Sequence, residues 1–208
     1  MRVAIVGGPG IGKSTLVRQL GDLYHNGSYG EGEKGVWDPR VLEDLETGKN
    51  PIGVTAYFAA LYDANYRDAA DNDRNDKVIF FEGARITLEA HMAEYRAETH
   101  ADLRKVLAIG DSWHPDRVIV LTSSTDTIEK HIRLRNRPHE DAENMVRRFR
   151  LIDREFRRLA PSYPNAIVID RDGKEFHERS GLLDIITAAG LPMFNEIPYA
   201  RLERHGAL

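Results

Sequence analysis

The chain contains no cysteine among its 208 residues. This absence excludes disulfide bonds, thiolate metal sites and cysteine nucleophiles. Long hydrophobic runs are also missing, because no segment approaches the roughly 20 apolar residues that a helix needs to cross a bilayer. Residues 3–6 are the only apolar stretch before the first glycine, and they are too few for the hydrophobic region of a signal peptide. We therefore expect a cytoplasmic protein without a membrane partner.

Neither sign of charge dominates. The 29 Lys and Arg residues nearly balance 33 Asp and Glu residues, and the formal net charge of -4 gives no general attraction to nucleic acid. The eight histidines show no metal-ligand spacing. The length fits one domain, and no repeat or linker divides the chain. We therefore expect a single domain over residues 1–208, with an irregular tail over about residues 191–208.

Four short apolar runs stand at residues 3–6, 78–81, 118–121 and 166–169. They are rich in β-branched residues and too short for helices. Each run is continuous rather than alternating, which is typical of strands buried on both faces of a parallel sheet. Longer segments with helical periodicity separate them, and this alternation predicts an α/β layered fold.

Two of the helical segments have readable packing patterns. Apolar residues from Met145 to Leu159 recur at spacings of four and three, which predicts a helix with one buried stripe. A second helix is expected over about residues 52–70. Its expected packing positions include Ala56, Ala59, Ala60 and Tyr66. Residues 25–35 hold four glycines and predict a mobile loop.

The strongest local signal is the sequence GGPGIGKS at residues 7–14, which fits the G-x-x-x-x-G-K-[ST] phosphate loop between a strand and a helix. Glycines allow consecutive N–H groups to approach phosphate oxygens, and the following helix directs its positive dipole end at the same charge. Lys13 supplies a cation for the β- and γ-phosphates, and the Ser14 hydroxyl can ligate Mg²⁺. The nucleotide-binding residues expected from this loop are Gly8, Gly10, Ile11, Gly12, Lys13, Ser14 and Thr15.

A phosphate loop alone does not distinguish a kinase from a GTPase, an ATPase or a helicase. The chain is short for a motor protein, and no N-K-x-D guanine-reading motif is present. The remaining polar residues must therefore separate these classes.

An acid and an arginine follow the second apolar run. Glu82 stands at its carboxyl end, beside the crevice in which α/β folds bind ligands. A carboxylate there can hold Mg²⁺ or accept a proton, and the fork of Arg85 can grip a substrate phosphate. The alternative is a strand-end acid that caps the next helix.

Arg133, Arg135 and Arg137 lie within five residues, just before Pro138. A loop that closes over ATP would bring such cations to the phosphates, where they stabilise the charge of the transferring group. We expect a lid over about residues 133–141, with Arg135 among the nucleotide-binding residues. A solvated helix end is the alternative. Of the arginines on the next helix, Arg147 or Arg148 could also reach the phosphates.

A second pair of carboxylates, Glu31 and Glu33, lies in the glycine-rich loop. A kinase that acts on a hydroxyl often uses a base on a different strand end from the Mg²⁺ ligand. Either acid is a candidate for this base, and an exposed loop acid is the alternative.

Taken together, these elements resemble the P-loop nucleoside and nucleotide kinase superfamily, which includes deoxynucleoside, thymidylate and adenylate kinases. The phosphate loop matches directly, residues 82–85 resemble the acid-plus-arginine element, residues 115–121 the strand before the lid, and residues 133–137 the lid. In deoxynucleoside kinases the arginine usually follows the acid directly, whereas Gly83 and Ala84 intervene here, as in monophosphate kinases. The resemblance implies a three-layer P-loop NTPase fold with a five-stranded parallel sheet, its short extra strand before or within residues 25–35.

Three functions follow from this resemblance and from the residues. The first is transfer of the γ-phosphoryl group of ATP, with Mg²⁺, to a nucleoside or a (deoxy)nucleoside monophosphate. The second keeps the chemistry but uses a hydroxyl of nucleic acid, such as a hydroxymethylated base in phage-type DNA, which would have to be flipped out of a duplex. The third is a P-loop ATPase switch that transfers phosphate only to water. The expected partners are accordingly a nucleoside or nucleotide substrate or a nucleic acid. The sequence is also compatible with a homodimer.

Overall fold

The computed structural model describes residues 1–25, 28–31, 38–71, 78–108, 114–135, 141–176 and 178–193, without the side chains of Leu42, Glu46 and Arg135. Within these ranges, none of the helices combines the length and hydropathy needed to cross a membrane.

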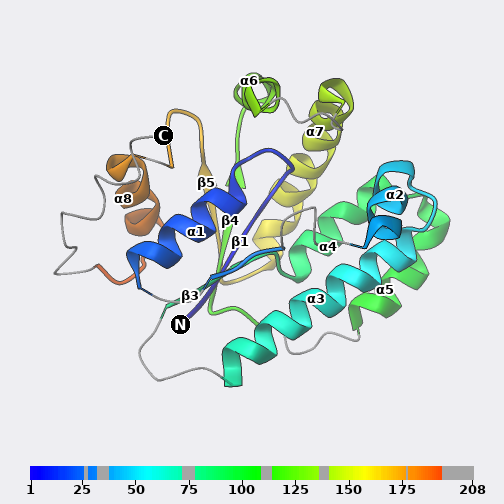
Figure 1. The fold of residues 1–208 in the computed structure, drawn as a ribbon, viewed down its shortest axis with the longest axis horizontal. Helices are drawn as coiled ribbons and strands as arrows, with labels where there is room; N and C mark the ends of the chain where they lie inside the picture. The colour runs from blue at the N-terminus through cyan, green and yellow to red at the C-terminus, as the bar shows by residue number, and fades with distance from the viewer. Residues whose placement is uncertain are drawn as a thin grey trace.

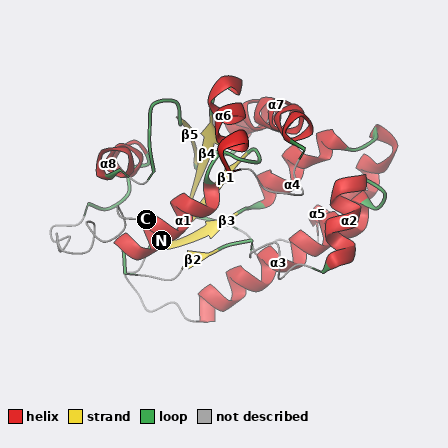
Figure 2. Ribbon diagram, turned by 45° about the horizontal axis from the view of Figure 1, so that its top comes forward, coloured by secondary structure: helices red, strands yellow, loops and turns green. Residues whose placement is uncertain are grey.

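A five-stranded, all-parallel sheet forms the centre of the molecule, with the strand order β2-β3-β1-β4-β5 (Figures 1 and 2). Its strands are β1 (Arg2–Gly7), β2 (Ser28–Tyr29), β3 (Ile79–Glu82), β4 (Arg117–Thr122) and β5 (Ala166–Asp170). The α/β class and the five parallel strands are confirmed. The extra strand β2 lies within residues 25–35, as the family resemblance implies.

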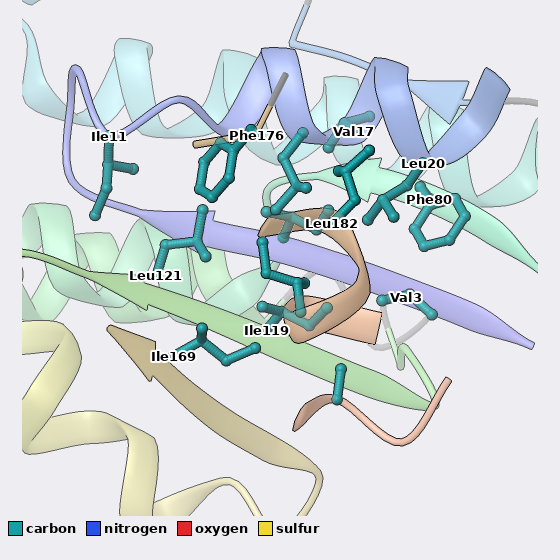
Figure 3. Packing of buried hydrophobic residues seen from close by; sticks show 14 of the residues in the cluster. Val3, Ile11, Val17, Leu20, Phe80, Ile119, Leu121, Ile169, Phe176 and Leu182 are labelled. Carbon is teal, nitrogen blue, oxygen red and sulfur yellow. The ribbon is translucent and has the colours of Figure 1, made fainter. Parts of the chain in front are cut away.

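Helices cover both faces of this sheet and give the expected three layers (Figure 1). They are α1 (Lys13–Leu23), α2 (Pro39–Thr47), α3 (Pro51–Asp71), α4 (Arg85–His91), α5 (His100–Ala108), α6 (Thr125–Arg135), α7 (Ala142–Leu159) and α8 (Arg179–Ala188), with 3-10 turns at Met92–Glu94, Ala97–Thr99 and Ala160–Ser162. Because alternate strand residues point to opposite faces, Val3 and Ile5 pack with α1 and α8, whereas Ala4 and Val6 pack with α4 and α7. Figure 3 shows the first of these two cores.

The two helical patterns of the sequence are found in α7 and α3. Met145, Phe149, Ile152 and Phe156 are buried in α7, as predicted.

In α3, Ala59 and Tyr66 are buried, but Ala56 and Ala60 face solvent, so those two packing predictions are wrong. The buried stripe of α3 runs through Val54, Phe58 and Tyr62 to Tyr66 at spacings of four. Residues two positions away from such a stripe lie on the opposite side of a helix.

The strand β5 also differs from expectation. It forms the edge of the sheet next to β4, and the side chain of Val168 is 47 % exposed. The prediction that residues 166–169 are buried on both faces is therefore wrong. A continuous β-branched run suits a strand that is covered on one face as well as one covered on two, so the pattern alone does not distinguish an edge strand from a central one.

Helix α2 was not predicted from the sequence. The Asp38 side chain caps it by accepting the N–H of Arg40 at 2.8 Å, Pro39 begins it, and Gly48 ends it in the left-handed region at φ 64°. An acid before proline at one end and glycine at the other are known helix boundaries, and they are the signal that could have found this helix.

Candidate active site

The phosphate loop lies between the end of β1 and the start of α1, as the sequence predicts. Gly12 sits directly before α1 with a φ of 95°, a conformation that side-chain-bearing residues rarely adopt. No side chain among the described residues caps this end of α1. The first N–H groups of the helix are therefore available to an anion, which is the donor arrangement that a phosphate group requires.

Lys13, Ser14 and Glu82 meet beside this loop. The Lys13 Nζ atom lies 3.3 Å from the carbonyl oxygen of Gly8, and the Ser14 hydroxyl donates to Glu82 Oε1 at 2.9 Å. Glu82 ends β3, next to β1, and is only 6 % exposed. The carboxylate predicted to stand at the strand end is thus in direct contact with the hydroxyl predicted to ligate Mg²⁺. This donor pair fits a Mg²⁺ ion that completes its shell with water and phosphate oxygens.

Glu31 lies next to Glu82 because β2 pairs with β3. It follows β2 by two residues, and the β2 residue Tyr29 is held on α3 by a 2.6 Å hydrogen bond from its hydroxyl to Asp68. Burial raises the pKa of Glu82, and the negative charge of Glu31 raises it further, while Lys13 and the Ser14 hydroxyl lower it. Two carboxyl groups therefore share the carboxyl ends of adjacent strands.

Tyr62 of α3 fixes the orientation of Glu31. Its hydroxyl donates to Glu31 Oε1 at 2.5 Å, and its ring is buried. A Cβ atom on Gly83 would stand 2.3 Å from Cζ of Tyr62, and Gly83 has a φ of 90°. The glycine that separates the acid from the arginine in this chain therefore has a packing reason: it makes room for the ring that holds Glu31.

The predicted arginines occupy different surroundings. Arg85 begins α4 and pairs with Glu89, with 2.9 Å between Nε and Oε1. Arg133 lies within α6 and pairs with Glu129 at 2.7 Å, with its side chain 59 % exposed. Arg135 ends α6, and its side chain is not described. Arg137 and Glu33 lie outside the described residues, as does most of the predicted lid.

A buried ion cluster joins α7 to the turn after α4, and nothing in the sequence predicts it. Arg148 pairs with Glu94, and His91 Nδ1 lies 2.6 Å from Glu94 Oε2; the side chains of Arg148 and Glu94 are 19 % and 11 % exposed. Burial alone would raise the pKa of Glu94, but the hydrogen bonds and charges of His91 and Arg148 lower it to about 2. The described contact of Arg148 is thus with Glu94, while Arg147 bonds Asn144.

We expect Glu94→Gln to destabilise the fold by about 3 kcal/mol at pH 7, the free energy that corresponds to lowering the pKa from 4.5 to about 2. The ionised carboxylate stabilises the protein above pH 4.5, and this stabilisation is lost as the pH falls toward 2. Urea unfolding of both proteins should therefore show a difference that shrinks by roughly half at pH 3. Glu98→Gln, on the exposed turn that follows, is the control. An equal difference at both pH values would contradict the assignment.

The strand order and the phosphate loop define a P-loop domain, the class that binds nucleoside triphosphates. The model of the AAA domain family (AAA_28) matches residues 2–163, most of the chain, and the protein belongs to this family.

Solved structures extend the comparison of the fold. Deoxyadenosine kinase from M. mycoides with bound dATP is 17 % identical with a TM-score of 0.66, covering 91 % of this chain and 100 % of that one. The same enzyme with bound dCTP is 16 % identical with a TM-score of 0.65, covering 90 % of this chain and 97 % of that one. NadR protein in complex with NR is 15 % identical with a TM-score of 0.63, and the match covers 94 % of this chain but 51 % of that one. No curated protein matches the sequence. At these identities the likeness concerns the fold.

Proposed function

We propose that the protein transfers the γ-phosphoryl group of ATP to a hydroxyl of a nucleoside or a (deoxy)nucleoside monophosphate. The observation that carries this proposal is the pair of carboxyl groups, Glu82 and Glu31, at adjacent strand ends beside Ser14 and Lys13. Phosphoryl transfer to a hydroxyl needs a site for Mg²⁺ and a proton acceptor, and two acids in different contacts can divide these tasks. The similarity to a deoxyadenosine kinase, an enzyme named for a nucleoside acceptor, supports the same acceptor class.

In this proposal the phosphate loop, with Ser14 and Glu82, binds the triphosphate and Mg²⁺. The N–H groups of Gly8, Gly10, Ile11 and Gly12, with those of Lys13, Ser14 and Thr15, hold the phosphates, while the ammonium group of Lys13 neutralises their charge. Ser14 and Glu82 would hold Mg²⁺. When bound, this ion offsets the negative charge on the β- and γ-phosphates. It would also favour the ionised form of Glu82, whose pKa burial and Glu31 raise.

Glu31 is the proposed proton acceptor. The acceptor oxygen forms a bond to the γ-phosphorus, the bond from that phosphorus to the bridging oxygen breaks, and ADP leaves. The proton of the acceptor hydroxyl passes to the Glu31 carboxylate. The hydrogen bond from the Tyr62 hydroxyl to Oε1 holds that carboxylate in a fixed orientation for this transfer. Glu33, which the sequence offers equally, lies outside the described residues.

The arginines complete the site in this proposal. Arg85 begins the helix that follows Glu82, and a substrate phosphate would replace Glu89 as the partner of its guanidinium group. Arg133, Arg135 and Arg137 belong to the lid, and their side chains approach the phosphates when it closes. Closure also excludes water, which favours transfer over hydrolysis.

Glu31→Gln is expected to lower kcat by about 100- to 10,000-fold, the usual contribution of a general base. The amide keeps the shape of the side chain and still accepts the Tyr62 hydroxyl, so the KM for ATP should stay close to that of the wild type. Steady-state kinetics with the accepted substrate measure both constants. Glu33→Gln, two residues further along the same loop, is the matched control and should retain most of the activity. The reverse ranking of the two variants would assign the base to Glu33.

A hydroxyl of nucleic acid is the second candidate acceptor, and the exposed side of α7 favours it. Arg147, Arg150, Arg154 and Arg158 are exposed along this helix. Arg150 and Arg154 make no ion pair within the described parts of the chain. Arginines at such spacings can contact successive phosphates of a nucleic-acid backbone. This local positive charge exists although the net charge of the whole chain is negative.

One experiment separates the acceptors. The protein is incubated with Mg²⁺ and ATP labelled in the γ-phosphate, and with nucleosides, nucleoside monophosphates, or plain or hydroxymethylated DNA. We expect the label in the nucleoside or monophosphate pool. Label in hydroxymethylated DNA would instead establish the second candidate, and label in free phosphate alone would show an ATPase switch.

A further inference from the structure

A buried arginine supports the phosphate loop from behind. Arg171 directly follows β5 and is only 8 % exposed. Its Nη1 atom donates to the carbonyl oxygen of Ile11 at 2.9 Å. The main chain of Arg171 is fixed as well, because its N–H donates to Thr122 at 2.8 Å. A cation from the far edge of the sheet is thus bonded directly to a peptide of the phosphate loop.

Phe176 completes the support under the loop. The guanidinium carbon of Arg171 lies 4.7 Å from the centre of the Phe176 ring. This ring packs so closely against Gly12 that a Cβ atom there would stand 3.1 Å from it. Figure 3 shows Phe176 beside Ile11 and beneath the start of α1. Arg171 therefore has an aromatic face on one side and the loop peptide on the other.

The bond to Ile11 determines which way the next N–H group points. No cis peptide bond occurs among the described residues, so the Ile11–Gly12 peptide is trans and its C=O and N–H groups point in opposite directions. With the carbonyl directed at Arg171, the N–H of Gly12 is directed away from Arg171. A hydrogen bond from a charged donor is about twice as strong as a neutral one and holds this plane firmly.

The energetic cost of Arg171 indicates more than a packing role. Its Nε atom is buried and has no partner among the described residues. Burying a charged group with an unsatisfied donor costs free energy that an apolar side chain would not require. The negative charges of Glu175 and Asp172 offset part of this cost. A triphosphate bound on the other side of the loop would offset more of it.

We propose that Arg171 is a positioning residue for triphosphate binding: it orients the Ile11–Gly12 peptide and places a buried positive charge behind the phosphates. This inference rests only on triphosphate binding by the loop, and it does not depend on which hydroxyl accepts the phosphoryl group.

The surrounding loop should keep its structure without the guanidinium group. The neighbouring Asp172 accepts the hydroxyl of Ser123 at 2.5 Å and the N–H of Ser124 at 3.0 Å, at the start of α6. These bonds lower the pKa of Asp172 to about 2 against the opposing effect of burial. Because Asp172 anchors the loop separately, Arg171 can be replaced while the main chain around it is retained.

The test measures the binding of inorganic tripolyphosphate and of a non-hydrolysable ATP analogue by calorimetry, with no acceptor present. Arg171→Met is expected to weaken both affinities by about 10- to 100-fold, the range for a hydrogen bond to a charged group. Arg171→Lys keeps the charge and one donor and should restore part of the loss. Lys174→Met, in the same loop, removes an exposed ammonium group bonded to the Asp170 carbonyl and serves as the control.

Wild-type affinity for tripolyphosphate in a folded Arg171→Met protein would overturn the proposal. A loss confined to the ATP analogue would also overturn it, because Arg171 would then act on the nucleoside part. If Arg171→Met does not fold, Arg171→Lys decides: unchanged tripolyphosphate affinity contradicts the proposal, and a partial loss supports it. These binding measurements do not involve phosphoryl transfer. They therefore test the role of Arg171 even if no nucleoside acceptor is found.

Discussion

Lys13→Ala is expected to remove nearly all phosphoryl transfer while the protein stays folded. The Lys13 ammonium group has one described hydrogen bond, to Gly8 at 3.3 Å, and it stands where a triphosphate would meet the loop. Its loss removes a cation from the charge that develops in the transition state, and one preorganised donor of this kind is worth about 100- to 1,000-fold in rate. Since little of the core depends on Lys13, the midpoint of thermal unfolding should hardly move.

The measurement is label transfer from ATP to the preferred acceptor, compared with thermal unfolding of the same samples. Lys49→Ala is the control, because this exposed lysine forms only a 3.5 Å ion pair with Glu43 on the surface. It should behave as the wild type in both assays. Turnover near that of the wild type in a folded Lys13→Ala protein would refute the role of Lys13.

Glu82→Gln should have the second large effect, a loss of kcat of about 100- to 1,000-fold with a Mg²⁺ dependence shifted to higher concentrations. The amide can still accept the Ser14 hydroxyl, so the local contact is retained while the negative charge is removed. A neutral ligand holds a hard cation less well than a carboxylate does.

The same substitution should not destabilise the protein at pH 7. Burial and the charge of Glu31 raise the pKa of Glu82, so its ionised form is disfavoured in the folded state. The group therefore costs stability at any pH above the ordinary pKa of a glutamate. A neutral side chain removes that cost, and the unfolding midpoint should equal or exceed that of the wild type. Activity and Mg²⁺ titrations, with exposed Glu98→Gln as control, complete the test. An unchanged titration would contradict a role of Glu82 in holding the metal.

The local parts of this site could be predicted because their signals lie within a few residues. The strand, glycines, lysine and serine of the phosphate loop are contiguous, and Glu82 directly follows an apolar run. The short strand β2 was expected only from the family resemblance, because two residues are too few to show a period of their own.

The relations between distant elements could not be predicted in the same way. Glu31 lies beside Glu82 only because β2 pairs with β3, and no local pattern encodes that neighbour choice. The pair of Arg148 and Glu94 joins residues 54 positions apart, and the bond from Arg171 to Ile11 spans 160 positions. In the sequence Arg171 has no distinguishing pattern, and Arg148 was a candidate phosphate contact rather than a partner of Glu94. Their contacts depend on how the helices and the last loop pack on the sheet.

Together, these contacts describe a phosphate loop that is supported on two sides. Glu82 contacts it through Ser14 on one side, and Arg171 contacts it through Ile11 on the other. Phe149 of α7 packs against Gly8, where a Cβ atom would stand 2.5 Å from its ring. A loop held in this way is already arranged for an anion, so little ordering has to accompany binding.

A crystal structure of the protein with Mg²⁺ and a non-hydrolysable ATP analogue tests the central claim most directly. We predict that the β- and γ-phosphates lie within hydrogen-bonding distance of the N–H groups of residues 10–14 and of Lys13 Nζ, with the metal next to Ser14. A nucleotide bound elsewhere, with the loop empty, would contradict the account.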